Sequence, residues 1–306
     1  MKKLILLIVA LPLALILITA IVTFPAHRQI RSIHPPLPDF DAIAAALDVA
    51  SGPVSVSYLN SASQRSPYGT LGHPGVLLEW SDGRRFLIDT GMPPEQAIAF
   101  GKPLEFILDA ESTETYGSLA QQLGAAVDSI EGIAFTHLHS DHTDGLPTIC
   151  AAQTAPATVF QTPLQFSERN YTTELGFKAF HGAACERRQL AAENIMTLPG
   201  FPGLVAVSLG GHTPGSTLYA ARIADKFWLF SGDITNDRKS LLQDLPKHWL
   251  YSAIIVPEDT ARTALLRDYL LALDKIDSAT VLPAHDVEAM AASLPKYAGA
   301  SGMQTP

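Results

Sequence analysis

The first half of the chain alternates hydrophobic and polar positions in a way that predicts a β-rich start. Residues 54–58 alternate as a half-buried strand should. Residues 75–80 and 85–88 are apolar runs, and the turn residues 81–83 between them indicate a hairpin. Leucines spaced by four predict a helix over residues 116–123, and a strand is expected at residues 130–135.

The second half repeats this order. Strand-like runs are expected at residues 204–209, 216–223 and 227–230. A strongly periodic helix follows over residues 259–273, with Asp259 as its N-cap. A strand at residues 279–282 and a helix at residues 287–294 close the pattern. Two sheets with helices outside would bury both β-runs, so the chain is predicted to be an α+β protein.

The amino terminus has a different composition from the rest. After Lys2 and Lys3, residues 4–24 carry no charge, and as a helix they would be roughly 31 Å long, close to a bilayer core of about 30 Å. A cleaved export signal has a shorter apolar region and small residues before the cut, whereas here Ala26 is paired with Phe24. The pattern favours an uncleaved transmembrane segment, and a cleaved signal is the alternative.

The chain is therefore expected to have four segments. They are a membrane anchor or signal (residues 1–26), a proline-rich tether with a short helix (27–52), the main domain (53–297) and a flexible tail (298–306). Positive charge flanks the apolar segment on both sides, and its distribution slightly favours a cytoplasmic amino terminus. We therefore expect the main domain on the periplasmic side, anchored to the membrane, or secreted to the periplasm if residues 1–26 are cleaved.

Charge and cysteine content limit the partners. The formal net charge is −9 and lysines and arginines are scattered, which argues against a nucleic-acid partner. Cys150 and Cys185 could pair in an exported domain or remain two buried thiols. The sequence does not indicate an oligomeric state.

Candidate chemistry is concentrated in the segment from Thr136 to His142. His137, His139, Asp141 and His142 fall within six positions directly after an apolar strand. In an extended segment residues two apart point the same way, so His137 and His139 can face one ion together. The following turn can aim Asp141 and His142 at a second ion. Imidazole and carboxylate are suitable ligands for zinc and similar divalent ions.

Three more segments place a ligand-type residue where a strand runs into a turn. His212 follows residues 205–209, Asp233 follows residues 227–230, and His285 follows residues 279–281. Each is weak evidence alone, but together they supply three further ligands at strand ends, where a rigid scaffold presents reactive groups.

This set of residues, in this order and spacing, resembles the metallo-β-lactamase superfamily along nearly all of residues 54–290. Residues 87–91 (Leu-Ile-Asp-Thr-Gly) also resemble an early strand-end motif of that family. The resemblance implies a four-layer αββα sandwich with two metal ions at one edge between the sheets. It implies the following assignments: first ion, His137, His139 and His212; second ion, Asp141, His142 and His285; bridge between them, Asp233.

The resemblance also implies a hydrolase. Two divalent ions, Zn²⁺ first and Mn²⁺ or Fe²⁺ as alternatives, would lower the pKa of a bridging water so that hydroxide is available near neutral pH. Asp141 could orient that hydroxide and move a proton. The expected substrate is a small ester, lactone, thioester or phosphoester, and no Gly-x-Ser-x-Gly nucleophile motif is present.

Differences from individual branches of the superfamily narrow the expected substrate. The lactamases usually lack the bridging carboxylate, so Asp233 favours lactonases, thioesterases and phosphodiesterases. N-acyl-homoserine lactonases carry a tyrosine three residues after that aspartate, and Asn236 in that place puts this activity in doubt. His139 argues against the diiron flavoproteins, which have Glu there. Asp89 is expected to be structural, and His73 is a candidate for lining the site.

Two other functions remain as alternatives. One is a redox enzyme with a single iron, like the sulfur dioxygenases of the same superfamily. The other is a non-catalytic metal-binding membrane module, which the complete ligand set argues against. The number and identity of the bound metal ions would separate these from a binuclear hydrolase.

Overall fold

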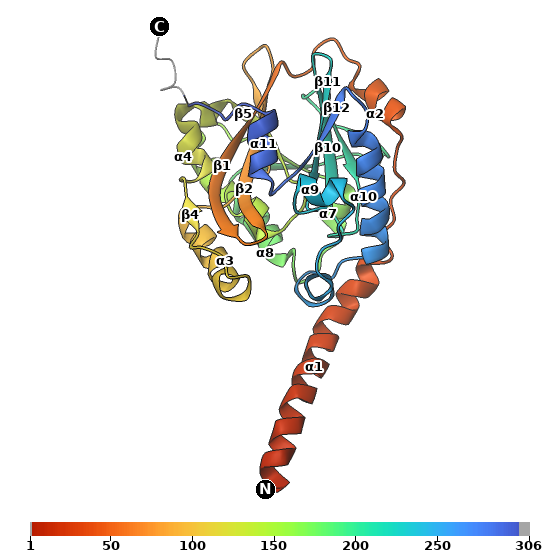
Figure 1. The fold of residues 1–306 in the computed structure, drawn as a ribbon. Coiled ribbons are helices and arrows are strands. Elements are labelled where there is room, and N and C mark those ends of the chain that lie inside the picture. Colours follow the sequence, from red (N-terminus) through yellow and green to blue (C-terminus); the bar gives the residue numbers. More distant parts are fainter. Residues whose placement is uncertain (1, 300–306) are drawn as a thin grey trace.

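Two β-sheets stand face to face in the centre of the molecule, and helices cover the outer face of each (Figure 1). The computed structural model describes residues 2–299, with side chains described at residue 14 and from residue 17 onward. The layers run helix, sheet, sheet, helix, which confirms the predicted αββα sandwich.

The larger sheet has seven strands in the order β4-β1-β2-β3-β5-β6-β7. β1, β2 and β3 pair antiparallel, with Tyr58 opposite Val76 and Val76 opposite Ile88, while β3, β5, β6 and β7 run parallel. The bounds are β1 (Ser55–Ser66), β2 (Gly69–Glu79), β3 (Arg85–Ile88), β4 (Glu114–Thr115), β5 (Ile130–Ala134), β6 (Thr158–Gln161) and β7 (Glu186–Gln189).

The smaller sheet has five strands in the order β12-β11-β10-β9-β8. All neighbours are antiparallel except β12, which runs parallel to β11. The bounds are β8 (Met196–Thr197), β9 (Leu204–Ser208), β10 (Thr217–Ile223), β11 (Lys226–Gly232) and β12 (Ala279–Pro283).

The two sheets bury one hydrophobic core between them and one more on each outer face. The central core is rich in aromatic rings that meet edge to face, such as Phe201 with Trp80 and with Phe86. Burial of such rings is a large apolar contribution to stability, and the edge contacts add to it. The cores on both faces of the smaller sheet explain why β9 and β11 are apolar at consecutive positions rather than alternating.

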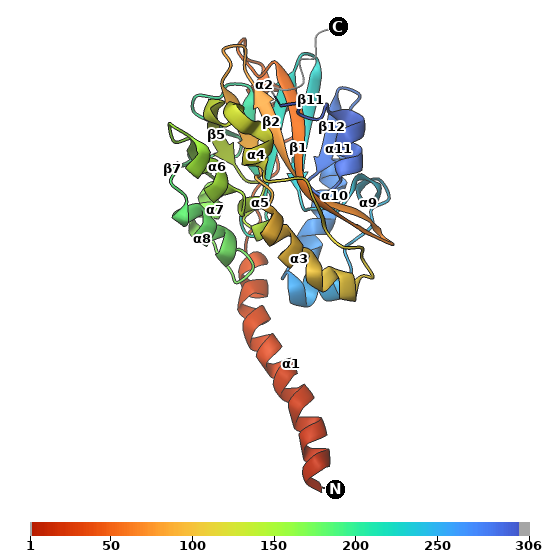
Figure 2. The ribbon, with the colours of Figure 1, turned by 90° about the vertical axis from the view of Figure 1, so that its left-hand side faces the viewer.

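Helices α3, α4, α6 and α8 lie on the side of the larger sheet that faces the viewer in Figure 2, and α2, α9 and α10 contribute to the outer core of the smaller sheet. Asp259 caps α10 by accepting from the backbone of Ala261 and Arg262, as predicted. The predicted helix at 116–123 begins later, because Ser118 and Gln121 form a capping box. The bounds are α2 (Phe40–Leu47), α3 (Pro94–Ile107), α4 (Leu119–Leu123), η1 (Gly124–Ser129), α5 (Ser140–Thr143), α6 (Leu146–Ala152), α7 (Pro163–Ser167), α8 (Glu174–Gly182), α9 (Arg238–Leu242), η2 (Tyr251–Ile255), α10 (Thr260–Asp274) and α11 (Val287–Ser293).

The amino-terminal helix α1 (Lys2–Ile30) leaves the molecule at one end, and only its last turns touch the domain (Figure 1). Ile30 is fully buried. His27 Nε2 lies 3.0 Å from the carbonyl oxygen of Ala253, and Gln29 donates to the Glu168 carboxylate at 2.8 Å. The end of α1 is therefore fixed against η2 and the loop after α7.

Residues 31–39 continue from α1 as an extended segment along the domain. Arg262 donates to the Pro35 carbonyl at 2.6 Å and Tyr269 to the Pro38 carbonyl at 2.8 Å. The short predicted helix is α2, whose Ile43 and Leu47 are buried against the smaller sheet. Two donors from α10 thus hold the proline-rich segment in place.

Among the described residues, no helix combines the length and apolar character needed to cross a membrane. The membrane segment predicted over residues 4–24 falls largely on residues whose side chains are not described, and it gains no support from the structure. The predicted tail likewise lies mostly outside the described residues, from residue 300 onward.

A disulfide joins Cys150 in α6 to Cys185, just before β7. The sequence left open whether these cysteines pair. The bond ties a helix on the outer face of the larger sheet to the edge strand of that sheet.

Candidate metal centre

All seven predicted ligands meet at one edge of the sandwich, between the two sheets. Each follows the end of a strand: β5 leads into the segment from His137 to His142, β9 leads to His212, β11 to Asp233 and β12 to His285. All seven side chains are buried, the most exposed at 9%. The loops after these four strands therefore bring five imidazoles and two carboxylates close together.

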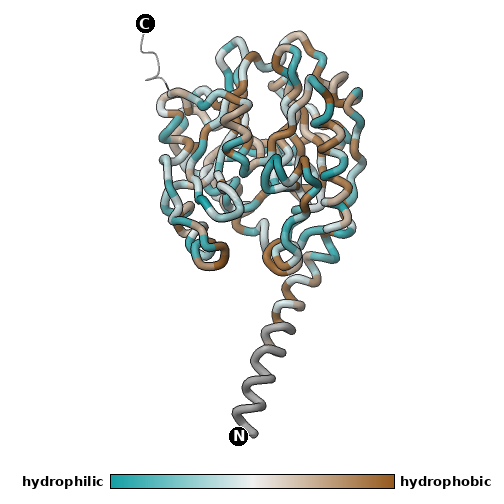
Figure 3. The backbone as a smooth tube through the Cα atoms, in the orientation of Figure 1, coloured by the Kyte–Doolittle hydropathy of each residue, from teal (hydrophilic) through white to brown (hydrophobic). Residues whose placement is uncertain are grey.

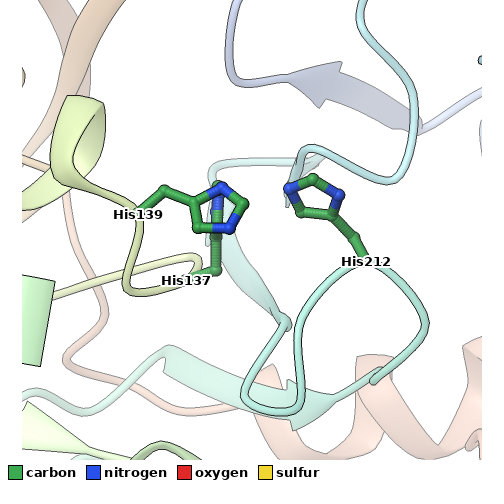
Figure 4. A group of neighbouring side chains, drawn as sticks. All are labelled: His137, His139 and His212. Atoms are coloured by element: carbon green, nitrogen blue, oxygen red, sulfur yellow. The ribbon is translucent and has the colours of Figure 1, made fainter. Parts of the chain in front are cut away.

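The first group consists of His137, His139 and His212, whose ligand nitrogens lie within 4.8 Å of one another. Figure 4 shows the rings of His137 and His139 on one side and that of His212 facing them. Nε2 of His137 and Nδ1 of His139 are 3.0 Å apart. Three nitrogens at this spacing can form one face of a tetrahedral site.

The second group consists of Asp141, His142 and His285. His285 Nε2 lies 3.3 Å from an Asp141 carboxylate oxygen, and His142 Nε2 lies 3.8 Å from the same oxygen. Both rings face Asp233 as well.

Asp233 lies between the two groups. Its carboxylate is 2.9 Å from His285 Nε2 and 3.5 Å from His142 Nε2 on the side of the second group. On the other side it is 3.8 Å from His212 Nε2 and 3.9 Å from His137 Nε2. A carboxylate in this position can bridge two ions.

Hydrogen bonds fix the tautomer of each ligand histidine. The Nδ1 atoms of His142, His212 and His285 lie 2.9, 2.6 and 2.6 Å from Asp89, Glu258 and the Gly72 carbonyl, which are all acceptors. These three rings therefore carry the proton on Nδ1 and turn the lone pair of Nε2 to the centre.

The remaining two ligand histidines are fixed through threonines. Thr172 donates its hydroxyl proton to Asn170, so it accepts from His139 Nε2–H at 3.1 Å and leaves Nδ1 free for a metal. Thr136 donates to Asp89 and can accept from His137 Nδ1 at 3.3 Å. All five histidines thus turn one basic nitrogen inward.

Asp89 holds the loop below the centre. Besides His142, its carboxylate accepts from the backbone N–H and the hydroxyl of Thr136 at 2.8 and 2.7 Å. Its backbone has a φ of 60°, a left-handed conformation that is uncommon for a residue other than glycine. This is the structural role that the sequence indicated for Asp89.

Protonation divides the ligands into two sets. Burial lowers the pKa of His139 to about 3, and burial likewise lowers the pKa of His137 and His212, so these rings are neutral. Burial opposes protonation of His285 too, but the negative charges of Asp233 and Asp141 raise its pKa to about 10. Burial also opposes protonation of His142, but the negative charges of Asp89, Asp141 and Asp233 raise its pKa well above the usual value. Protons on His142 and His285 therefore take the place of cations in the metal-free protein.

The family model for the metallo-beta-lactamase superfamily matches residues 69–285, a range that contains all seven predicted ligands. The chain belongs to the metallo-beta-lactamase superfamily. It is a metal-dependent hydrolase of that superfamily. No curated protein matches the chain closely enough to count as a relative.

Solved structures of metal-dependent hydrolases share the fold at low sequence identity. An N-acyl homoserine lactone hydrolase with its product at the catalytic metal centre has a TM-score of 0.58 and 15% identity, over 80% of this chain and 98% of that one. A probable metal-dependent hydrolase from Staphylococcus aureus has a TM-score of 0.53 and 14% identity, over 78% and 91%. AidC, a dizinc quorum-quenching lactonase, has a TM-score of 0.51 and 13% identity, over 78% and 92%.

The donor atoms of this metallo-beta-lactamase domain fit a pair of divalent ions. Within residues 17–299, the buried atoms without a hydrogen-bond partner include His142 Nε2, His212 Nε2 and Asp233 Oδ1. Buried polar groups normally find partners, so this inward-facing set of unpaired atoms fits bound cations. Nitrogen and carboxylate donors suit zinc and related first-row ions.

Two residues below the first group were missed by the sequence reasoning. Glu258 contacts His212 and also pairs with Lys247 Nζ at 2.9 Å, and both side chains are almost fully buried. Although burial opposes ionisation, Lys247 and the hydrogen bond from His212 lower the pKa of Glu258 to about 2. Glu258 stands in a loop and Lys247 in another, so neither follows a strand or motif that could have pointed to it.

The side chain of Asn236 is exposed, whereas all seven predicted ligands are buried. The doubt that Asn236 raised about homoserine-lactone hydrolysis therefore stands beside the fold likeness to lactonases.

Proposed function

We propose that this protein is a binuclear hydrolase of small esters or lactones, with thioesters and phosphoesters as further substrates to be tested. The observation that carries the proposal is the position of Asp233 within 3.9 Å of ligand nitrogens from both groups. A single-iron enzyme would not need the second group. The fold likeness to lactonases supports carboxylic esters and lactones as the first bonds to examine.

The metal pair, when bound, supplies Lewis acidity and a water of lowered pKa. The chain supplies the rest. Asp141 has a carboxylate oxygen beside His285 and is suited to accept and pass on a proton. Glu258 and Lys247 hold His212, and Asp89 holds His142, so that the donors keep their geometry while substrate binds.

We propose that Tyr251 contacts the substrate, because Asn236 stands where homoserine lactonases carry a tyrosine. It is carried by η2, a single π-helical turn, a form often found at functional sites. Its ring lies 5.3 Å from Lys247 Nζ, which contacts the Asp233 carbonyl oxygen. Burial, with the nearby Glu258 and Asp233 carboxylates, raises the pKa of Tyr251 well above 10, so its hydroxyl remains a donor at neutral pH.

Metal content and turnover of the full chain test the proposal together. We expect close to two divalent ions per chain and hydrolysis of at least one ester or lactone in a panel that also holds thioesters and phosphodiesters. Asp233→Asn should lose the second ion and at least about a hundredfold in kcat, because one bridging charge is removed. One ion per chain, or full activity in Asp233→Asn, would refute the binuclear mechanism.

We also propose that the domain acts outside the cytoplasm, with residues 4–24 as its membrane attachment. The disulfide supports an oxidising compartment. Helix α1 leaves the domain at the same end of the molecule as the end of α3 and η2, and Figure 3 shows hydrophobic colour at these two places. All three elements carry exposed apolar side chains there: Leu17, Ile18, Ile21, Val22 and Phe24 in α1, Phe106 and Ile107 in α3, and Ile254 and Ile255 in η2. Extraction of membranes at high pH should retain the full chain, and recovery of all the protein in the soluble fraction would argue against attachment.

A further inference from the structure

One buried imidazole beside the second group is not among the seven predicted ligands. His73, in β2, is 2% exposed. In the part of the chain with described side chains, its Nδ1 atom has no hydrogen-bond partner. That atom lies 3.9 Å from an Asp141 carboxylate oxygen. A histidine with a purely structural role would be expected to pair this nitrogen.

The spacing fits a shared ion. A ligand atom of His73 lies within 4.8 Å of those of Asp141 and His285. With metal–ligand bonds of about 2.0–2.2 Å, two donors on one ion are separated by at most about 4.4 Å. The 3.9 Å between His73 Nδ1 and Asp141 satisfies this limit.

The position of His73 is fixed from both the backbone and the ring. Its N–H donates to Asn60 Oδ1 at 3.0 Å, and its carbonyl accepts from the Ser61 hydroxyl at 2.9 Å. Its ring meets Phe100 and His285 edge to face, with centroids 5.3 and 5.6 Å away. A side chain held this firmly keeps its nitrogen in place before an ion arrives.

The strand irregularity that supports His73 lies in β1. The pairing of β1 with β2 shifts register between Asn60 and Ser63, directly opposite the segment that carries His73. Asn60 is buried and its amide donates to the Ser63 hydroxyl, so its oxygen is presented to His73 N–H. Irregular pairing of this kind commonly re-aims a side chain next to a functional site.

We propose that His73 is a ligand of the second metal ion, together with Asp141, His142, His285 and the bridging Asp233. The assignment rests on the proposed binuclear site. Three imidazoles and two carboxylates favour zinc, iron or cobalt over manganese or magnesium, because the latter prefer oxygen donors. The second ion in this chain would then be held more tightly than a ligand set without His73 would hold it.

Replacement of His73 by phenylalanine tests the assignment, because Phe keeps a ring between Phe100 and His285 but has no donor nitrogen. We would load the full-length His73→Phe protein with Zn²⁺ or Co²⁺ and titrate it with a competing chelator, following metal content and the Co²⁺ absorption spectrum. His248→Phe, the same change at an exposed histidine, is the matched control. We expect at least a tenfold loss of affinity for one of the two ions in His73→Phe and none in His248→Phe. Equal retention of both ions and an unchanged Co²⁺ spectrum in His73→Phe would overturn the assignment.

A measurement on the unaltered protein guards against a variant that fails to fold. Nitrogen NMR of ¹⁵N-histidine-labelled, Zn²⁺-loaded protein distinguishes rings bound through Nδ1 from rings bound through Nε2. We expect two Nδ1-bound rings, His139 and His73, whereas only one would overturn the assignment. Fewer than two ions in the unaltered protein would instead refute the binuclear function and the assignment together. Two ions with a single Nδ1-bound ring would refute the role of His73 alone.

Discussion

The Nδ1 atom of His212 lies 2.6 Å from a carboxylate oxygen of Glu258, and this contact determines which ring nitrogen faces the metal centre. Glu258 is in turn neutralised by Lys247 at 2.9 Å and accepts a hydrogen bond from Ser252. The first group is therefore supported by a buried ion pair that lies outside the seven predicted ligands.

Glu258→Gln should weaken metal binding by roughly ten- to a hundredfold, because it removes the negative charge that makes His212 a stronger donor and leaves Lys247 without its counter-ion. Competition with a chelator measures the affinity. Glu193→Gln, at an exposed position, should bind metal like the unaltered protein. Unchanged affinity in Glu258→Gln would mean that His212 is oriented by other contacts.

The stability of the metal-free protein should fall as the pH rises from about 6.5 toward 10. The pKa of His285 is raised to about 10 in the folded state by Asp233 and Asp141, against the burial that opposes it, so the folded state holds a proton that the unfolded state releases near pH 6.5. Its stabilisation is complete below pH 6.5 and is lost on passing pH 10. Urea unfolding of the chelator-treated protein at several pH values should show this decline. His285→Gln should reduce the decline to the part that the raised pKa of His142 contributes, and an equally steep decline in that variant would assign the proton elsewhere.

Reduction of the disulfide should lower the free energy of unfolding by about 2–4 kcal/mol, since Cys150 and Cys185 are 35 residues apart and the bond restricts the unfolded chain. Urea unfolding with and without a reducing agent measures the change. A protein with both cysteines replaced by alanine should unfold at the same urea concentration in either condition. If reductant destabilises that double variant as well, the effect does not come from the disulfide.

Tyr269→Phe should cost about 1 kcal/mol of stability, because it removes the hydrogen bond from the Tyr269 hydroxyl to the Pro38 carbonyl. Thermal unfolding measures the loss. Tyr68→Phe provides the control, since Tyr68 is 82% exposed and should change little. An equal effect of the two substitutions would show that the Pro38 contact contributes nothing specific.

The sequence predicted the parts of this centre that follow local rules. His137, His139, Asp141 and His142 could be recognised because a strand and a turn fix their relative directions within six residues. Asp259 could be recognised as a cap because it precedes a periodic helix. Local pattern also identified most of the strands, since their apolar residues are contiguous.

The features that the sequence did not predict depend on contacts between segments far apart in the chain. Glu258 and Lys247 act on His212 from loops that carry no pattern of their own. Strand β1 extends well beyond the predicted residues 54–58, because Asn60, Ser61 and Gln64 are polar but buried, and each makes hydrogen bonds across the fold. The exact place of His73 depends on the register shift of β1, which no spacing in the sequence reveals.

The contacts of Gln29 have a practical consequence for anyone who wishes to prepare a soluble form of the enzyme. Gln29 bonds to Glu168 and to the Arg169 carbonyl, and the same loop carries Thr172, which orients His139. A chain shortened to begin at Asp39 would lose these hydrogen bonds of Gln29, together with the buried Ile30. A cut before Ala26 would remove all of the apolar segment at residues 4–24 and keep the contacts of Gln29 with the loop that carries Thr172.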